Sequence, residues 1–404
     1  MKTPRLLTTL AVLGSFTSAF AQLSIPDANG TDGPLNATAT PIDLSQAIPG
    51  DALLSSNSGG NSGKGIYDAA RWVIVFKYSS VNVPVGTTVT FLNHPSNAPV
   101  VWLVQGNVTI AGTVSVNGKN GVLGTLVNPA DGGPGGFRGG ATGPQGGGAG
   151  LGPGGAGGGG VGEFNSSYSS PEILPLIGGS GGSGSPSYSS SGGAGGAILI
   201  VSPGTIAFPG TVGSITALGG LRGDGNTNSG GSGGAIKLIA EQITGTGSLN
   251  TGLRGRVRIQ ANSLAASVTS TPATIAVSVG GVGATPVLFQ ALSSPRVRIV
   301  SVTYTRGTPP VQYVIPAPAD PTAPLISAAD LSVESNNPVT IAIETRDFTT
   351  GGATVAVRIA NKYGGATSLP ATLQSGGTST LSTWLLSTTL PPGFTTLQVR
   401  ATQP

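Results

Sequence analysis

The 404-residue chain contains 68 glycines and no cysteine, and this combination limits the folds open to it. Without cysteine no disulfide can stabilise the chain, so it depends on backbone hydrogen bonds and stacked apolar side chains. The glycines recur at the edges of short runs of strand-forming residues, where tight corners need backbone angles that other residues resist. The sequence therefore predicts a repetitive all-β architecture.

The first 21 residues have the form of a secretion signal. Lys2 and Arg5 precede an apolar run, and Ala19-Phe20-Ala21 places small residues at the alternate positions that a signal peptidase accepts. No later stretch reaches the roughly 18 to 20 uninterrupted apolar residues of a membrane helix. We therefore expect a signal peptide over residues 1–21, no transmembrane segment, and a secreted, extracellular or cell-surface location.

The charge pattern narrows the class of partner. Charged residues make up 8% of the chain, and the 19 lysines and arginines are scattered along it, giving a formal net charge of +4. A nucleic-acid backbone is bound by a dense basic patch, so composition argues against nucleic acid as a partner. A mild positive charge is compatible with a polysaccharide or a cell-surface matrix.

Short apolar runs that repeat along the chain predict a stacked fold. Residues 22–65 are rich in proline, serine and asparagine, which indicates an irregular lead segment or N-terminal cap. Further on, Ala197-Ile198-Leu199-Ile200-Val201 is echoed 38 residues later by Ala235-Ile236-Lys237-Leu238-Ile239. Units this small cannot bury their own apolar faces, so they must stack on one another. We predict a right-handed parallel β-helix, or solenoid, over residues 66–308; an antiparallel sandwich uses the same residue types but rarely repeats one strand order.

A glycine-rich insertion interrupts this domain at about residues 128–196. Between Asp131 and Gly160, 18 of 30 residues are glycine, without the strict three-residue period of collagen. The favoured interpretation is a floppy loop that projects from one rung. The alternative is a set of glycine-rich rungs or polyglycine-type helices that pack without side chains.

The C-terminal part of the chain has a different pattern. Six prolines between residues 309 and 325 predict an extended, semi-rigid linker. Over residues 326–404, runs such as Thr354-Val355-Ala356-Val357 alternate apolar and polar residues at period two. These runs predict a small immunoglobulin-like β-sandwich. The open ends of the preceding solenoid would also permit self-association.

A long motif runs from Tyr67 to Gly112, includes Asn93-His94-Pro95, and is followed by Gly135-Gly136-Phe137-Arg138-Gly139-Gly140. It resembles a recurring segment of exported, glycine-rich bacterial proteins, and the resemblance covers about residues 30 to 260. More loosely, the chain resembles bacterial β-helical surface proteins and adhesins. The resemblance implies export and a repetitive fold, and it implies no catalytic residue.

His94 is the only histidine of the chain. A catalytic or zinc-binding histidine needs partner residues, and the sequence has neither cysteine nor a cluster of carboxylates near it. We interpret His94 as a structural residue at a corner between two rungs and keep it as a candidate ligand contact.

Two further groups of residues match binding motifs. Asp27, Asn29 and Asp32 offer oxygen ligands for calcium, but their spacing departs from the EF-hand, so an Asx-rich turn in a polar cap is favoured. Arg222-Gly223-Asp224 lies in a loop between two repeats and matches the tripeptide of integrin ligands. Chance explains such a match in a glycine-rich chain, so Arg222 and Asp224 are kept only as candidate ligand contacts.

The sequence predicts no catalytic residue and no cofactor other than the calcium candidate. Between the repeats the few charges, such as Glu163 and Glu172, fall in loops without a repeating register. Trp72 and Trp102 could stack on sugars, but they lie in apolar runs typical of a core. The favoured function is a non-enzymatic structural or adhesive protein; the alternative is a carbohydrate-active β-helix enzyme or a polysaccharide-binding module.

Overall fold

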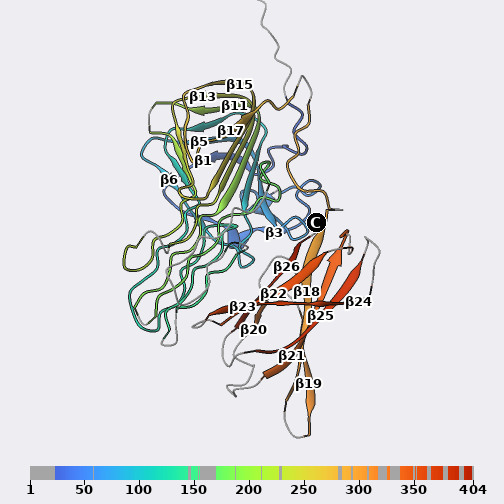
Figure 1. The fold of residues 1–404 in the computed structure, drawn as a ribbon. Helices are drawn as coiled ribbons and strands as arrows, with labels where there is room; N and C mark the ends of the chain where they lie inside the picture. Colours follow the sequence, from blue (N-terminus) through green and yellow to red (C-terminus); the bar gives the residue numbers. More distant parts are fainter. Residues whose placement is uncertain are drawn as a thin grey trace, which may run out of the picture.

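The structure, a computed structural model, is all-β (Figure 1). Its described helices are two 3-10 turns, η1 (Leu44–Gln46) and η2 (Gly59–Asn61), so no helix in this part of the chain is long enough to cross a membrane. The predicted signal peptide, residues 1–21, lies outside the described residues. The structure describes residues 23–402 except 58, 144–146, 153, 155–169, 187, 211, 227–229, 281–283, 293, 307–308, 317–324, 328–336, 349–350, 352, 362–364, 376–380 and 391–394.

The largest sheet is 10-stranded and runs in the order β17-β15-β13-β11-β8-β5-β4-β3, with β1 and β9 paired beside this path. All its strand pairs are parallel except β4 with β5. Its strands are β1 (Gly33–Asn36), β3 (Ile48–Pro49), β4 (Ile66–Asp68), β5 (Val73–Val83), β8 (Val100–Val104), β9 (Val108–Ile110), β11 (Ala197–Phe208), β13 (Ala235–Gly245), β15 (Arg256–Ala266) and β17 (Ile275–Val277).

A second, 5-stranded parallel sheet has the order β16-β14-β12-β10-β6. Successive stretches of chain contribute to both sheets in the same order, as β11 and β12 do before β13 and β14. The repeat found in the sequence corresponds to the pairing of strands, since Ala197 pairs with Ala235 and Val201 with Ile239. The strands of this sheet are β6 (Thr88–Val89), β10 (Thr113–Ser115), β12 (Ser214–Thr216), β14 (Ser248–Asn250) and β16 (Thr269–Thr271).

Both faces of the large sheet are buried along the first halves of its central strands, β5, β8, β11 and β13. Ile200 points into a core that also contains Ile215 and Leu249 from the second sheet. Its neighbour Leu199 points the other way, into a second apolar cluster covered by residues such as Leu288. Because side chains alternate between the faces, burial of both faces requires an unbroken apolar run, and the sequence of β11 begins with one.

The lead segment, residues 22–65, is more regular than the sequence predicts. Strand β1 pairs with β5, β2 (Ile42–Asp43) with β7 (Phe91–Leu92), and β3 with β4, all in parallel. Arg71 fastens this segment, because its Nη1 lies 3.0 Å from the Asp51 carboxylate and 2.5 Å from that of Asp68. The segment therefore covers an edge of the large sheet that would otherwise expose unpaired backbone groups.

The C-terminal strands form two antiparallel sheets that share one core, in the orders β19-β18-β21-β25-β24 and β20-β26-β22-β23. Ile341, Val357 and Trp384 lie in that core, as their period-two pattern predicts, and Val302 joins them although it was predicted to belong to the β-helix. The strands are β18 (Arg296–Arg306), β19 (Val311–Pro316), β20 (Leu325–Ser327), β21 (Asn337–Arg346), β22 (Thr354–Asn361), β23 (Ala366–Pro370), β24 (Thr372–Ser375), β25 (Ser382–Leu390) and β26 (Thr395–Thr402).

The boundary between the two parts differs from the prediction. The sequence predicts that the β-helix ends at residue 308 and that residues 309–325 form a linker. In the structure β18 pairs antiparallel with both β19 and β21, so residues 296–306 and 311–316 belong to the C-terminal sheets. An apolar alternation does not show the direction of strand pairing. Of the prolines predicted to form a linker, Pro309 and Pro310 lie in the turn before β19, Pro316 ends β19, and the other three lie outside the described residues.

The described part of the glycine-rich insertion is packed and hydrogen bonded, so its interpretation as a floppy loop was wrong. Its extended segments run side by side with neighbouring stretches of chain, teal to yellow-green at the lower left of Figure 1. We call this array the glycine bundle. Its segments are residues 116–124, 130–143, 147–152, 176–185, 188–196, 217–223 and 230–235.

Hydrogen bonds between these segments recur every third residue. The N–H groups of Gly118 and Gly121 donate to the carbonyls of Leu218 and Leu221, with N···O distances of 2.9 and 2.8 Å. A period of three is that of the polyproline II helix, which makes no hydrogen bonds within itself and must bond to neighbours or water. The antiparallel neighbour has the same period, with N–H to carbonyl bonds from Ser190 to Val122, Gly193 to Lys119 and Gly196 to Val116.

Close approach of backbones explains why glycine fills the bundle. A Cβ built on Gly195 would lie 2.0 Å from the carbonyl oxygen of Ala217, and one on Gly193 would lie 1.9 Å from that of Asp131. Neither glycine has a positive φ, so space rather than backbone angle selects it. The alternative of polyglycine-type helices packed without side chains describes these segments.

Candidate functional site

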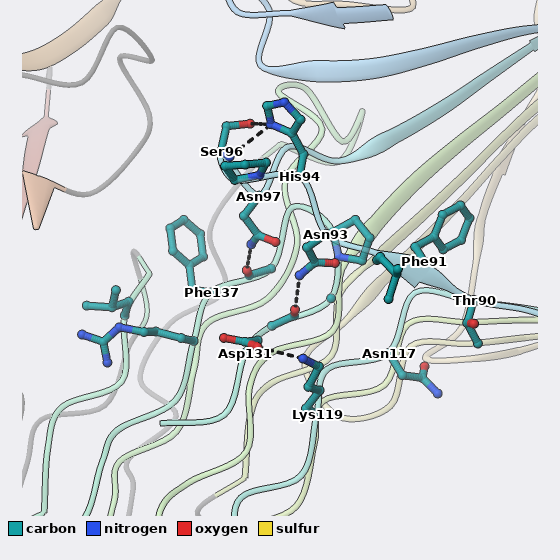
Figure 2. Close-up of a pocket in the computed structure, with 18 of the residues that line it drawn as sticks. Thr90, Phe91, Asn93, His94, Ser96, Asn97, Asn117, Lys119, Asp131 and Phe137 are labelled. Atoms are coloured by element: carbon teal, nitrogen blue, oxygen red, sulfur yellow. Dashed lines mark hydrogen bonds and ion pairs between the residues drawn. The ribbon is translucent and has the colours of Figure 1, made fainter. Parts of the chain in front are cut away.

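A cleft of about 570 Å³ opens where the corner at residues 90–97 meets the edge of the glycine bundle. Two chain stretches form its walls, the corner after β7 on one side and residues 131–138 on the other (Figure 2). Its volume falls in the range of about 300–1,000 Å³ that small-ligand sites occupy. Both motifs quoted for the resemblance, around Asn93 and around Phe137, therefore face the same cleft.

Two asparagines join these walls. The Nδ2 group of Asn93 donates to the carbonyl of Gly132 at 2.8 Å, and Nδ2 of Asn97 donates to the carbonyl of Gly136. Asn97 has a φ of 53°, in the left-handed region that asparagine tolerates better than most residues. Its Oδ1 is shielded from solvent and accepts no hydrogen bond in the described chain. A buried acceptor without a donor costs folding free energy, and Asn97 Oδ1 is one of five buried side-chain atoms without a hydrogen-bond partner among the described residues.

His94 lies on the rim of this cleft, and its contacts are structural. Its Nδ1 lies 2.8 Å from Ser96 Oγ and 3.1 Å from the Ser96 backbone nitrogen, which donates to it. The imidazole packs on Tyr67, with ring centroids 4.3 Å apart. The Trp72 indole donates to the Ser96 carbonyl and is buried beside the corner. These contacts support the interpretation of His94 as a corner residue.

The charged side chains that line the cleft already have partners. Lys119 Nζ lies 2.8 Å from Asp131 Oδ2, and both side chains are exposed at the mouth. Burial lowers the pKa of Arg138 to about 10, and the positive charge of Arg358 acts in the same direction while Asp131 opposes it. Arg138 therefore keeps its charge at neutral pH and donates to the Gly139 carbonyl. Asp131 is the one carboxylate among the described lining residues.

A second candidate site is the end of the glycine bundle farthest from the sheets. Large apolar side chains are exposed there, on turns that hydrogen bond to one another: Gly124 N–H donates to the Tyr188 carbonyl and Gly121 N–H to that of Leu221. Tyr188 itself is 60% exposed. We call this set of residues the tip patch, and it consists of Val122, Leu123, Leu126, Tyr188 and Leu221.

The Arg222-Gly223-Asp224 motif lies beside the tip patch, and its two charged side chains bind each other. Arg222 Nε donates to Asp224 Oδ1 at 2.9 Å, and a second ion-pair contact joins Nη2 to Oδ2. The guanidinium of Arg222 lowers the pKa of Asp224 to about 2. Because Arg222 and Asp224 form an ion pair with each other, neither charged group is presented separately to a receptor.

The calcium candidates lie in the lead segment, away from both sites. Asp27 pairs with the buried amine of Lys77, and Asn29 Nδ2 donates to Asp27 Oδ1 at 3.1 Å. Asp32 accepts the backbone N–H of Lys77 at 2.6 Å and that of Gly63 at 2.8 Å. A lysine thus supplies the positive charge that calcium would bring. No group of three metal-ligating side chains occurs among the described residues.

Sequence reasoning singled out His94, Arg222 and Asp224 but missed most of the cleft. Asn97 and Asn117 carry no motif, and Phe137 was noted only as part of a resemblance. The available signal was the spacing of Asn117-Gly118 and Asn120-Gly121, three residues apart, which matches the bundle period. The Oδ1 atoms of these asparagines accept the N–H groups of Leu218 and Leu221 at 2.7 and 2.8 Å.

Comparison with known proteins adds no assignment: no family model, no curated protein and no solved structure matches this chain.

Proposed function

We propose that this chain is an exported, non-enzymatic structural or adhesive protein of the cell surface or the extracellular matrix. Its stacked part would be a right-handed parallel β-helix, and its C-terminal part an immunoglobulin-like β-sandwich. Two parallel sheets fed in the same order by successive stretches of chain support the first assignment. Two antiparallel sheets around one core support the second.

The glycine bundle is the observation that carries this proposal. Its interior holds backbones too close together for side chains, so large side chains emerge only at its edges and turns. The tip patch places exposed apolar residues on those turns. Exposed apolar groups on a rigid support mark interaction surfaces in soluble proteins. The bundle would thus hold an adhesive surface away from the body of the protein.

Retention on insoluble polysaccharides and on cell-surface matrix tests the proposal. We expect the mature protein to be retained and the double variant Tyr188→Ser/Leu126→Ser to bind at least about tenfold more weakly, since two exposed anchors are lost. Val85→Ser is the matched control, because Val85 is 70% exposed but lies on a corner outside the bundle. Equal retention of the tip variant and the control would refute an adhesive tip.

The alternative is a carbohydrate-active enzyme or a polysaccharide-binding module. Most glycoside hydrolases use two carboxylates that flank the scissile bond. The described lining of the cleft supplies Asp131 alone, and Lys119 already pairs with it. Within this alternative the cleft favours binding over hydrolysis. Release of soluble fragments from any polysaccharide in the same assay would instead favour the enzyme.

A further inference from the structure

We propose that the corner cleft is a binding site for a short, neutral oligosaccharide. The inference does not rest on the adhesive function, because the cleft lies where the bundle meets the sheets and the tip patch lies at the bundle's other end.

The polar groups of the cleft suit hydroxyl groups. Asn93 is held by its Nδ2 group, so its remaining hydrogen-bonding capacity consists largely of its Oδ1 acceptor, whereas the Oδ1 of Asn97 is shielded from solvent. Asn117 is held the other way, because its Oδ1 accepts the Leu218 N–H, which leaves its Nδ2 donors. A sugar hydroxyl donates one hydrogen bond and accepts others, so it can satisfy both kinds of group. Figure 2 draws Asn93 and Asn117 among the side chains that line the cleft.

The apolar walls suit the carbon faces of sugar rings. Phe91 and Phe137 both line the cleft and are half-buried, so each presents part of a ring to it. The Phe91 ring is braced from behind by Trp102, with ring centroids 6.4 Å apart. Aromatic faces next to amide groups combine apolar contact with directional hydrogen bonds, and a sugar presents the matching two surfaces.

The charges favour a neutral ligand. Lys119 and Asp131 neutralise each other at the mouth. Arg138 already donates to the Gly139 carbonyl, and the positive charge of Arg358 in the C-terminal sheets contributes to lowering its pKa. Both cations among the described lining residues therefore already have partners, so neither is left free to pair with the carboxylate of an acidic sugar.

Isothermal titration calorimetry on the mature full-length protein tests this site. The probes are tetrasaccharides of β-1,4-linked glucose, xylose and mannose, with tetragalacturonate as the acidic counterpart. We expect at least one neutral probe to bind with a dissociation constant below 1 mM (about −4 kcal/mol) and tetragalacturonate to bind at least tenfold more weakly. Phe137→Leu should weaken neutral binding at least tenfold, whereas Phe137→Tyr, which keeps the ring, should retain it.

Controls separate this proposal from the adhesive one. Tyr188→Ser should bind the oligosaccharide as the unaltered protein does, even where it loses retention on the matrix. The proposal is overturned if no neutral probe binds, if tetragalacturonate binds best, or if Phe137→Leu with an unchanged melting temperature binds like the unaltered protein.

Discussion

The parallel sheets and the glycine bundle solve one problem in two ways. Both must pair the backbone N–H and carbonyl groups of neighbouring segments. In the sheets side chains alternate at period two, so Ile200 and its neighbours fill a core between the backbones. In the bundle hydrogen bonds recur at period three and the backbones almost touch, so there is no room for side chains. The two regions should therefore respond to substitution in opposite ways. Smaller residues should destabilise the sheets, and larger residues should destabilise the bundle.

The substitution with the largest expected effect places a large residue inside the bundle. Gly195→Val should lower the free energy of unfolding by more than about 4 kcal/mol, because the new Cβ would sit against the fixed Ala217 carbonyl. Gly60→Val is the matched control, since nothing lies within 4 Å of a Cβ built there, and it should change stability by less than about 0.5 kcal/mol. Urea unfolding followed by tryptophan fluorescence measures the free energy of unfolding, with the buried Trp102 of β8 as a probe in the large sheet.

The opposite change tests the sheets. Ile200→Ala should cost about 4 kcal/mol, because it leaves a cavity between the two parallel sheets where Ile200 is fully buried. The exposed Val212→Ala should cost little in the same unfolding experiment. A cost for Ile200→Ala no larger than that of Val212→Ala would show that the sheets are not held by their apolar core.

A buried charge on the outer face of the large sheet should make stability depend on pH. Burial, with added repulsion from Arg258 and opposed by Glu172, lowers the pKa of Lys237 from 10.5 to about 8. Between pH 8 and pH 10.5 the unfolded chain therefore holds a proton that the folded one has lost, so stability rises with pH by about 3 kcal/mol. Lys237→Met should remove this rise. Parallel pH profiles for the two proteins would contradict the assignment.

The smallest expected effect lies at the side-chain contacts of the bundle. Asn120→Ala removes the acceptor of the Leu221 N–H and should cost about 1 kcal/mol. Asn120→Asp keeps an acceptor oxygen and should cost less. Thermal unfolding of the three proteins compares them directly, and an equal cost for both substitutions would assign no role to the acceptor.

The sequence predicted what side-chain patterns encode. The all-β class and the register of Ala197 with Ala235 follow from apolar runs and their repetition. The packing of the glycine-rich insertion could not be predicted, because polyglycine segments form hydrogen bonds through backbone groups that every residue has. Strand β18 was wrongly predicted to belong to the β-helix, because the alternation of its apolar residues does not show whether it pairs in parallel or antiparallel. Of the site, His94 was placed at its corner, but Asn97 and Phe137 join the cleft through contacts 39 or more residues apart in the chain.

Hydrogen–deuterium exchange across residues 176–196 tests most directly whether backbone bonds alone order the glycine segments. If they do, amides such as Gly181, Gly193 and Gly195, which donate to the carbonyls of Leu151, Lys119 and Ser232, should exchange as slowly as those of β11. Exchange of the whole stretch at the rate of an unstructured peptide, beside a protected β11, would contradict the packed bundle and with it the adhesive tip.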